Sequence, residues 1–160
     1  MTDVSPDQFR ALCGRFVTGV AVITAAGPDG SVAGMTANSF ASVSLHPPLI
    51  SVNVDESAEM YRVLGGARHF VLNILEASQE AISRRFAEDH HARFEGIQFS
   101  LNDRGIPVLD GTLATIECEQ VQWLDAGDHR IFIARVIGGE AREGSPLLYF
   151  RGEYPGSRPA

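Results

Sequence analysis

Strand-like segments that follow one another closely along the chain constrain its fold more than any other feature. An apolar, β-branched run at residues 20–24 is followed by Gly-Pro-Asp-Gly at 27–30, a strong turn signal, and then by a second strand-like segment at 32–36. Further strand-like segments lie at 49–54, 70–75, 113–124, 129–137 and 147–150. Because they come as meander-like neighbours rather than in strict alternation with helices, the pattern predicts a mainly β fold. We expect an antiparallel β-barrel with helices outside, not a doubly wound sheet.

Two or three short helices are expected between these strands. Ser5 is placed to cap the first helix, Pro6 suits its first turn, and Gln8 completes a capping box. The apolar face of this helix, which should run to about residue 16, is formed by Phe9, Leu12, Cys13 and Phe16. A second helix is expected at 57–64, and Ser78 is placed to cap a third. The polar stretch 88–111 should be an exposed connection, and the tail 152–160 should be loose.

Length and charge limit the possible functions. The 160 residues suit one domain, with an ordered core expected at about 5–152. The formal net charge of -7 argues against nucleic acid or an anionic membrane as the main partner, although a few arginines could still hold a phosphate. No apolar run approaches the roughly 20 residues of a membrane helix. The first residues show no signal-peptide pattern, so a cytoplasmic location is expected.

Several kinds of catalytic site have no motif in this chain. There is no GxSxG elbow, no GxxxxGK[ST] loop and no GxGxxG at the start of a helix. Cys13 and Cys118 lie far apart in no zinc-binding pattern and are expected to be free, mostly buried thiols. His90 and His91 are interpreted as solvated loop residues, so no metal site is predicted.

One stretch, GMTANSFASVSLHPPLI at residues 34–50, does not suit an ordinary core strand, because small and hydroxylated residues crowd it. Two interpretations compete. The hydroxyl groups could satisfy local backbone groups in a twisted strand and loop. Alternatively, the small side chains could let the backbone approach a flat ligand, with N–H and hydroxyl groups binding its polar edge.

The residues of this stretch resemble the signature of the short-chain flavin reductase family, G-x-T-A-N-S-F-x-S-V-S-x-x-P-P-L. Four more segments resemble family elements: FRALCGRFVTGVAVITA at 9–25, RRFA at 84–87, GDHRIFIARV at 127–136 and PLLYFRGEY at 146–154. Ala134 and Phe150 depart from the residues that are frequent there, which are glycine and a polar residue.

This resemblance implies a six-stranded antiparallel split barrel that forms a homodimer and binds flavin near the dimer interface. It further implies an enzyme that reduces FMN or FAD by hydride transfer from NADH or NADPH and supplies reduced flavin to a partner monooxygenase. The alternative is a split-barrel relative that holds FMN without acting as a reductase. No short motif in the sequence chooses between FMN and FAD or between NADH and NADPH.

The resemblance also implies roles for individual residues. His129, in the GDH segment, would line the nicotinamide site as the catalytic residue. Asp128 would either orient His129 or end the strand, and the second role is preferred. Asp55 and Glu56 stand where negative charge would repel a phosphate unless they face away or cap a helix. The candidate cofactor-binding residues are Thr36, Ala37, Asn38, Ser39, Ser42, Val43, Ser44, Asn53, Ser57, Arg85, Phe86 and Tyr149.

Overall fold

The computed structural model of the chain describes residues 4–88 and 92–156. Its helices are α1 (Pro6–Cys13), α2 (Glu59–Gly66) and α3 (Glu80–Ala87), with a short 3₁₀ helix η1 (Ala77–Gln79) before α3. Its strands are β1 (Thr18–Gly19), β2 (Ala21–Ala26), β3 (Val32–Ala37), β4 (Ala41–Leu45), β5 (Pro48–Asp55), β6 (His69–Ile74), β7 (Phe99–Leu101), β8 (Pro107–Leu109), β9 (Ala114–Ala126), β10 (His129–Ala141) and β11 (Leu148–Tyr149).

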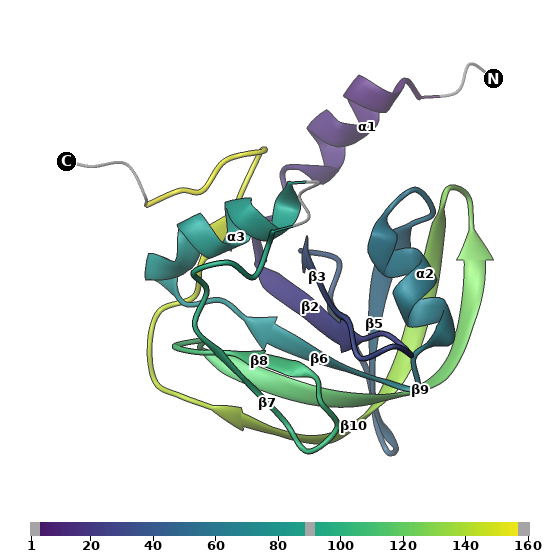
Figure 1. The fold of residues 1–160 in the computed structure, drawn as a ribbon. Helices are drawn as coiled ribbons and strands as arrows, with labels where there is room; N and C mark the ends of the chain where they lie inside the picture. The colour runs from purple at the N-terminus through teal and green to yellow at the C-terminus, as the bar shows by residue number, and fades with distance from the viewer. Residues whose placement is uncertain (1–3, 89–91, 157–160) are drawn as a thin grey trace.

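One strongly curved sheet organises the molecule (Figure 1). Its strand order is β3-β2-β6-β9-β10-β5-β4, and every pairing in it is antiparallel. This confirms the mainly β, antiparallel fold with peripheral helices. The sheet contains seven strands, because the unusual stretch 34–50 itself supplies the end of β3, all of β4 and the start of β5.

The curved sheet encloses an apolar core. Its largest fully buried side chains include Phe70, Phe132, Ile23 and Met60. A buried amide fixes the neighbouring segment, since Asn73 Nδ2 donates to the Val22 carbonyl at 3.0 Å and its Oδ1 accepts from Leu109 N at 2.9 Å. A buried amide is stable only when its N–H and C=O groups are hydrogen-bonded. The Asn73 amide therefore connects β8 to the sheet.

Two expectations about the second half of the chain are wrong. Stretch 88–111 is more than an exposed connection, because its later part forms the β7–β8 hairpin with Ile106 and Leu109 buried. The tail is not loose at Tyr154, whose hydroxyl lies 2.7 Å from Ser83 Oγ on α3. In both cases long-range packing outweighs a locally polar sequence.

The helix starts also differ in part from the sequence expectations. Ser5 caps α1 as expected, accepting from Gln8 N at 3.2 Å. Ser78, however, is not a cap; the side chain of Glu76 accepts from Ser78 N and forms a capping box with Gln79. Glu76 caps the short helix η1 that precedes α3, and the N-cap residue of α3 is Gln79, which makes no side-chain cap hydrogen bond.

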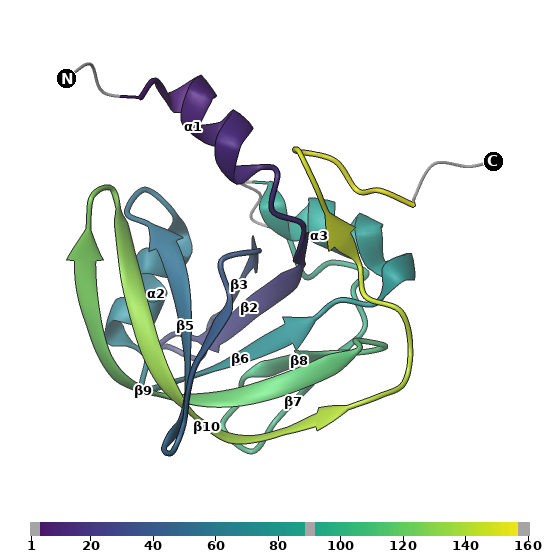
Figure 2. The same cartoon turned by 180° about the vertical axis from the view of Figure 1, so that it is seen from behind.

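Helix α1 carries the largest surprise of the fold. It ends at Cys13, projects from the body of the molecule, and none of its residues is buried (Figures 1 and 2). Cys13 is therefore exposed, which corrects the expectation for that thiol, whereas Cys118 is buried and burial raises its pKa to about 12. No described helix is long and apolar enough to cross a membrane.

Candidate functional site

Asn38 lies where three cavities meet, just beyond the end of β3. The cavities have volumes of about 580, 200 and 240 Å³, and Asn38 lines all of them. Its neighbour Ala37 is 8% exposed and lines the two smaller ones. A small side chain at 37 and an exposed amide at 38 thus leave room for a ligand beside the backbone, as the unusual stretch suggested.

The hydroxyl groups on either side of Asn38 serve the fold instead. Thr36 Oγ1 donates to the Ser83 carbonyl of α3 at 2.6 Å. Ser39 Oγ accepts from Asn53 N at 3.0 Å and donates to the Asn53 carbonyl at 2.9 Å, which ties the start of the β3–β4 connection to β5. The structural interpretation of the stretch is therefore confirmed for Thr36 and Ser39, whereas the ligand-binding interpretation stays a prediction for Ala37 and Asn38.

Gly34 illustrates the structural role most clearly. A Cβ atom there would lie 2.5 Å from the ring of Phe86. Phe86 is fully buried and packs edge to face on Phe94, with ring centroids 5.0 Å apart. Since a Cβ cannot fit, this glycine allows α3 to lie close to β3. Phe86 also lines the cavity beside α2.

The next three candidate residues lie apart from these cavities. Ser42, Val43 and Ser44 are in β4, where the pairing with β5 shifts register between Ser42 and Ser44. None of them lines the three cavities that meet at Asn38 in the described chain. Ser42 and Val43 are exposed.

A fourth cavity, of about 400 Å³, lies at the start of α2 and is suited to an anion. The N-cap residue Ala58 has no side chain that could satisfy the first N–H groups of the helix. Ser57, Arg62 and Arg93 line the same cavity, as does Glu59, whose Oε2 lies 3.5 Å from Arg93 Nη1. An open helix N-terminus with two arginines nearby favours a phosphate group.

From the sequence, the charge of Asp55 was expected to repel a phosphate unless its carboxylate faced away or capped a helix. In the structure, this carboxylate is bound within the turn before α2. Its Oδ1 accepts from Ser57 N at 2.7 Å and from Ser57 Oγ at 2.6 Å. These hydrogen bonds, the side-chain one foremost, hold the pKa of Asp55 below its usual value. Asp55 thus stabilises the turn that leads into α2.

Arg93 and Arg85 both hold the segment that follows α3. Arg93, with a side chain only 12% exposed, donates from Nη1 to the Gly34 carbonyl and from Nε to the Glu88 carbonyl, both at 2.8 Å. Arg85 Nη1 donates to the carbonyls of Ala92 and Glu95, at 3.3 and 3.1 Å. Asp89, His90 and His91 lie outside the described residues.

His129 begins β10 and faces the loop before α2. It is paired with Asp55 of β5, and its Nδ1 lies 2.7 Å from Asp128 Oδ1. Asn53 is two residues before Asp55 on the same strand face and is bound by Ser39. Figures 1 and 2 show the ends of β3 and β5 and the β9–β10 turn at the same end of the molecule, but neither Asn53 nor His129 lines the four cavities described above.

Two further residues, Tyr149 of β11 and Thr18 of β1, line the cavities that meet at Asn38. Tyr149 of β11 lines the cavities of about 580 and 200 Å³. Thr18, which sequence reasoning missed, lines the cavities of about 580 and 240 Å³, and its Oγ1 is buried with no hydrogen-bond partner among the described residues. A buried hydroxyl rarely lacks a partner, so Thr18 Oγ1 fits a polar ligand atom in this space.

Together these features fit a flavin nucleotide. A flat ring with a polar edge would fit here. The small side chain of Ala37 and the ring of Tyr149 line the space, and Thr18 offers a hydroxyl that has no partner among the described residues. The open start of α2 suits its phosphate. Arg62 and Arg93 were missed because their alignment with this helix end depends on the fold.

Comparison with known proteins gives an independent result. Residues 13–158 match the family model described as "Flavin reductase like domain". The chain is 42% identical to FMN reductase (NADH) SmoA of Agrobacterium fabrum over 147 residues, covering 92% of this chain and 83% of that one. It is 38% identical to the reductase component of the flavin-dependent trigonelline monooxygenase of Acinetobacter baylyi, covering 92% of this chain and 47% of that longer one.

A solved structure shows the same fold. The NADH:FAD oxidoreductase SgcE6 of Streptomyces globisporus, in complex with NAD and FAD fragments, superposes with a TM-score of 0.89 at 34% identity. The similarity covers 99% of this chain and 100% of that one.

Proposed function

This chain belongs to the flavin reductase like family, and we propose that it uses NADH or NADPH to reduce FMN or FAD. The observation that carries this function is the meeting of three cavities at Asn38, beside an unpaired buried hydroxyl and at the same end of the fold as His129. The reduced flavin then passes to a partner monooxygenase, in keeping with the relative that is such a reductase component. The need for NADH or NADPH in every turnover favours the cytoplasm.

The residues of the site divide the work of binding. Ala37 and Asn38 lie against the flavin ring, Tyr149 packs beside it, and Ser57 with the start of α2 holds the phosphate. His129 binds the nicotinamide. The flavin and the nicotinamide supply the redox chemistry, a hydride transfer, and the protein supplies orientation and exclusion of water. Thr36, Ser39, Asn53, Arg85 and Phe86 support this surface from behind through the contacts described above.

A simple assay tests the function. Purified protein is mixed with NADH and free flavin, and the loss of NADH absorbance is followed. Rapid loss that requires added flavin is expected from a reductase. A yellow protein that does not consume NADH would instead support the alternative, a split-barrel flavin carrier. A protein that neither binds flavin nor consumes NADH would contradict both.

We expect Arg62→Ala to weaken FMN binding about tenfold and riboflavin binding hardly at all. Arg62 is exposed beside the open start of α2, and a charge-assisted hydrogen bond to a phosphate is worth about 1.5–3 kcal/mol when desolvated, less at an exposed position. Titration of the two flavins into the variant measures the difference. Equal losses for FMN and riboflavin would place the phosphate elsewhere; Arg142→Ala, at a separate cavity, is the control.

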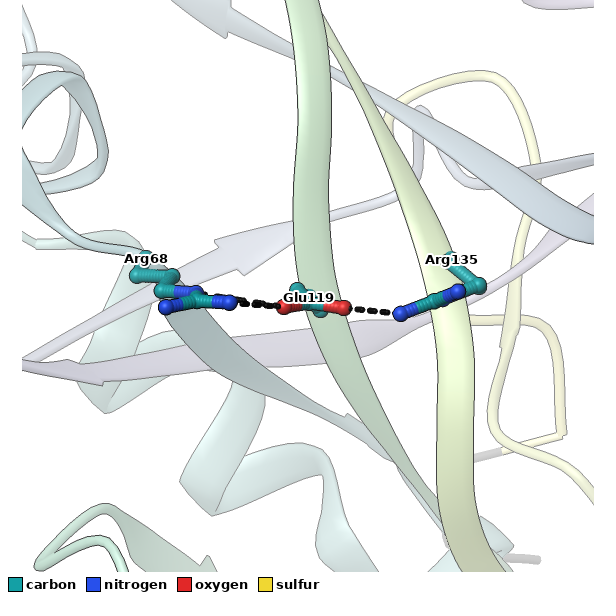
Figure 3. Close-up of polar contacts among 3 residues, drawn as sticks. All are labelled: Arg68, Glu119 and Arg135. Atoms are coloured by element: carbon teal, nitrogen blue, oxygen red, sulfur yellow. Dashed lines mark hydrogen bonds and ion pairs between the residues drawn. The ribbon is translucent and has the colours of Figure 1, made fainter.

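We also propose that the chain forms a homodimer. The apolar side chains of α1 and of the turn after it stay uncovered by the described residues: Phe9, Leu12 and Phe16 are 60, 63 and 79% exposed. The outer face of the sheet carries the partly exposed Ile131 and Ile133 of β10. A group of three ion-paired side chains lies on the neighbouring part of the sheet. In that group Glu119 lies between Arg68 and Arg135 (Figure 3), whose hydrogen bonds hold its pKa below the usual value. Exposed apolar surface of this extent marks an interaction site.

Sedimentation velocity tests the homodimer. The wild-type chain is expected to sediment as a dimer, and the double variant Leu12→Asp, Phe16→Asp as a monomer, because a charge on the α1 face opposes apolar burial. Leu101→Asp is the control, since Leu101 is 58% exposed on the distant β7–β8 hairpin. A monomeric wild-type protein, or a double variant that stays dimeric, would contradict this proposal.

A further inference from the structure

The side chain of Asp128 holds one nitrogen of His129. The two residues follow Gly127, whose φ of 65° closes the β9–β10 turn. His129 Nδ1 lies 2.7 Å from Asp128 Oδ1. The backbone of Asp128 is anchored as well, because its carbonyl accepts from Glu56 N at 3.0 Å. The carboxylate therefore reaches His129 from a turn that is fixed against the β5–α2 loop.

A second carboxylate borders the same imidazole. Asp55 is opposite His129 in the β5–β10 ladder, and one donor or acceptor atom from each of Asp55, Asp128 and His129 lies within 4.8 Å of the others. The geometry could suit a metal ion, but Asp55 Oδ1 already accepts two hydrogen bonds from Ser57, and Nδ1 is bound to Asp128. Among the described residues, the hydrogen bond that reaches the imidazole is the one made with Asp128.

An ionised carboxylate has no proton to donate, so the hydrogen bond to Asp128 requires the proton to be on Nδ1. In the neutral imidazole, Nε2 is then an acceptor, because the bond made by one ring nitrogen sets the state of the other. We propose that Asp128 is a positioning residue that keeps His129 in the Nδ1–H form, so that Nε2 accepts a hydrogen bond from the carboxamide NH₂ group of the nicotinamide. The second half of this statement rests on the proposed function.

The state of the ring can be measured without any substrate. Nitrogen-15 spectra of histidine-labelled protein at alkaline pH, assigned by comparison with His129→Ala, are expected to show His129 protonated on Nδ1. In Asp128→Ala the signal should change toward the Nε2–H form, and in Asp128→Asn it should stay, since the amide oxygen still accepts. An Nε2–H form in the wild-type protein, or no change in Asp128→Ala, would overturn the proposal.

Steady-state kinetics test the hydrogen bond from the nicotinamide carboxamide to His129 Nε2. Asp128→Ala is expected to raise KM for NADH about three- to fivefold, the scale of one exposed hydrogen bond, without changing flavin affinity. Asp128→Asn should stay within about twofold of wild type, and Asp128→Ala should have no effect in the His129→Ala background. The control is Asp103→Ala, an exposed acid of the β7–β8 turn.

Two outcomes separate this inference from the proposed function. A wild-type protein that reduces flavin normally, with NADH kinetics unaltered in Asp128→Ala, would overturn the positioning role and leave the reductase function intact. A wild-type protein that does not oxidise NADH would contradict the proposed function and with it the contact to nicotinamide. The nitrogen-15 spectra would still decide whether Asp128 sets the state of the ring.

Discussion

Asn38→Trp is expected to weaken flavin binding about 100-fold. Asn38 lines the three cavities that meet beyond β3, so a bulky ring there occupies the space that we assign to the flavin. Forcing the added ring and the flavin into the same space costs about 1–3 kcal/mol of binding free energy. A loss of about 2.7 kcal/mol corresponds to a 100-fold higher Kd. Flavin fluorescence titration measures the change. The protein should still fold, because the side chain of Asn38 is exposed and makes no described hydrogen bond to the core.

Two further variants make this result specific. Asn38→Ala should lose less than about tenfold in affinity, since it removes at most one hydrogen bond and fills no space. Ser100→Trp, which fills the separate cavity of about 650 Å³ beside β7 and β8, should bind flavin as the wild type does. Unchanged affinity in Asn38→Trp, or equal losses in Ser100→Trp, would show that the ring binds elsewhere.

His129→Ala is expected to lower kcat/KM for NADH about 10- to 100-fold, with flavin affinity within about threefold of wild type. The side chain is partly exposed at the start of β10 and lies 2.7 Å from Asp128, so under the proposed function its loss should affect the nicotinamide and not the flavin. Steady-state kinetics with varied NADH and a separate flavin titration measure the two effects.

His46→Ala is the matched control for this variant. His46 is exposed in the turn between β4 and β5, at the opposite end of β5 from Asp55 and His129. NADH kinetics of His46→Ala should match the wild type. Loss of flavin affinity in His129→Ala with normal NADH kinetics would mean that the histidine contacts the flavin instead.

Local patterns predicted a large part of this molecule. The turn residues at 27–30 placed the β2–β3 hairpin, and alternation along 49–54 placed β5 with Asn53 on the outer face. Ser5 and Pro6 placed the start of α1. The crowding of small residues at 34–50 singled out the stretch that contributes to the proposed site, because their size and polarity conflict with an ordinary core strand.

Features that depend on distant partners could not be predicted. Residues with the same kind of hydroxyl differ in role because Thr36 donates to a carbonyl of α3, whereas Thr18 Oγ1 has no hydrogen-bond partner in the described part of the chain. Arg93 was missed because its partners, Gly34 and Glu88, converge only in the folded chain. The amphipathic pattern of α1 indicated an apolar face, but it does not say whether that face is covered by the same chain or by a partner.

The position of the flavin ring tests the central claim most directly, and a crystal structure of the protein with FMN would show it. We expect the ring to lie against the backbone of Ala37 and Asn38, its phosphate at the start of α2 near Ser57, and its exposed face open toward His129. A ring bound outside this surface, with the space around Asn38 filled by protein or solvent, would contradict the account.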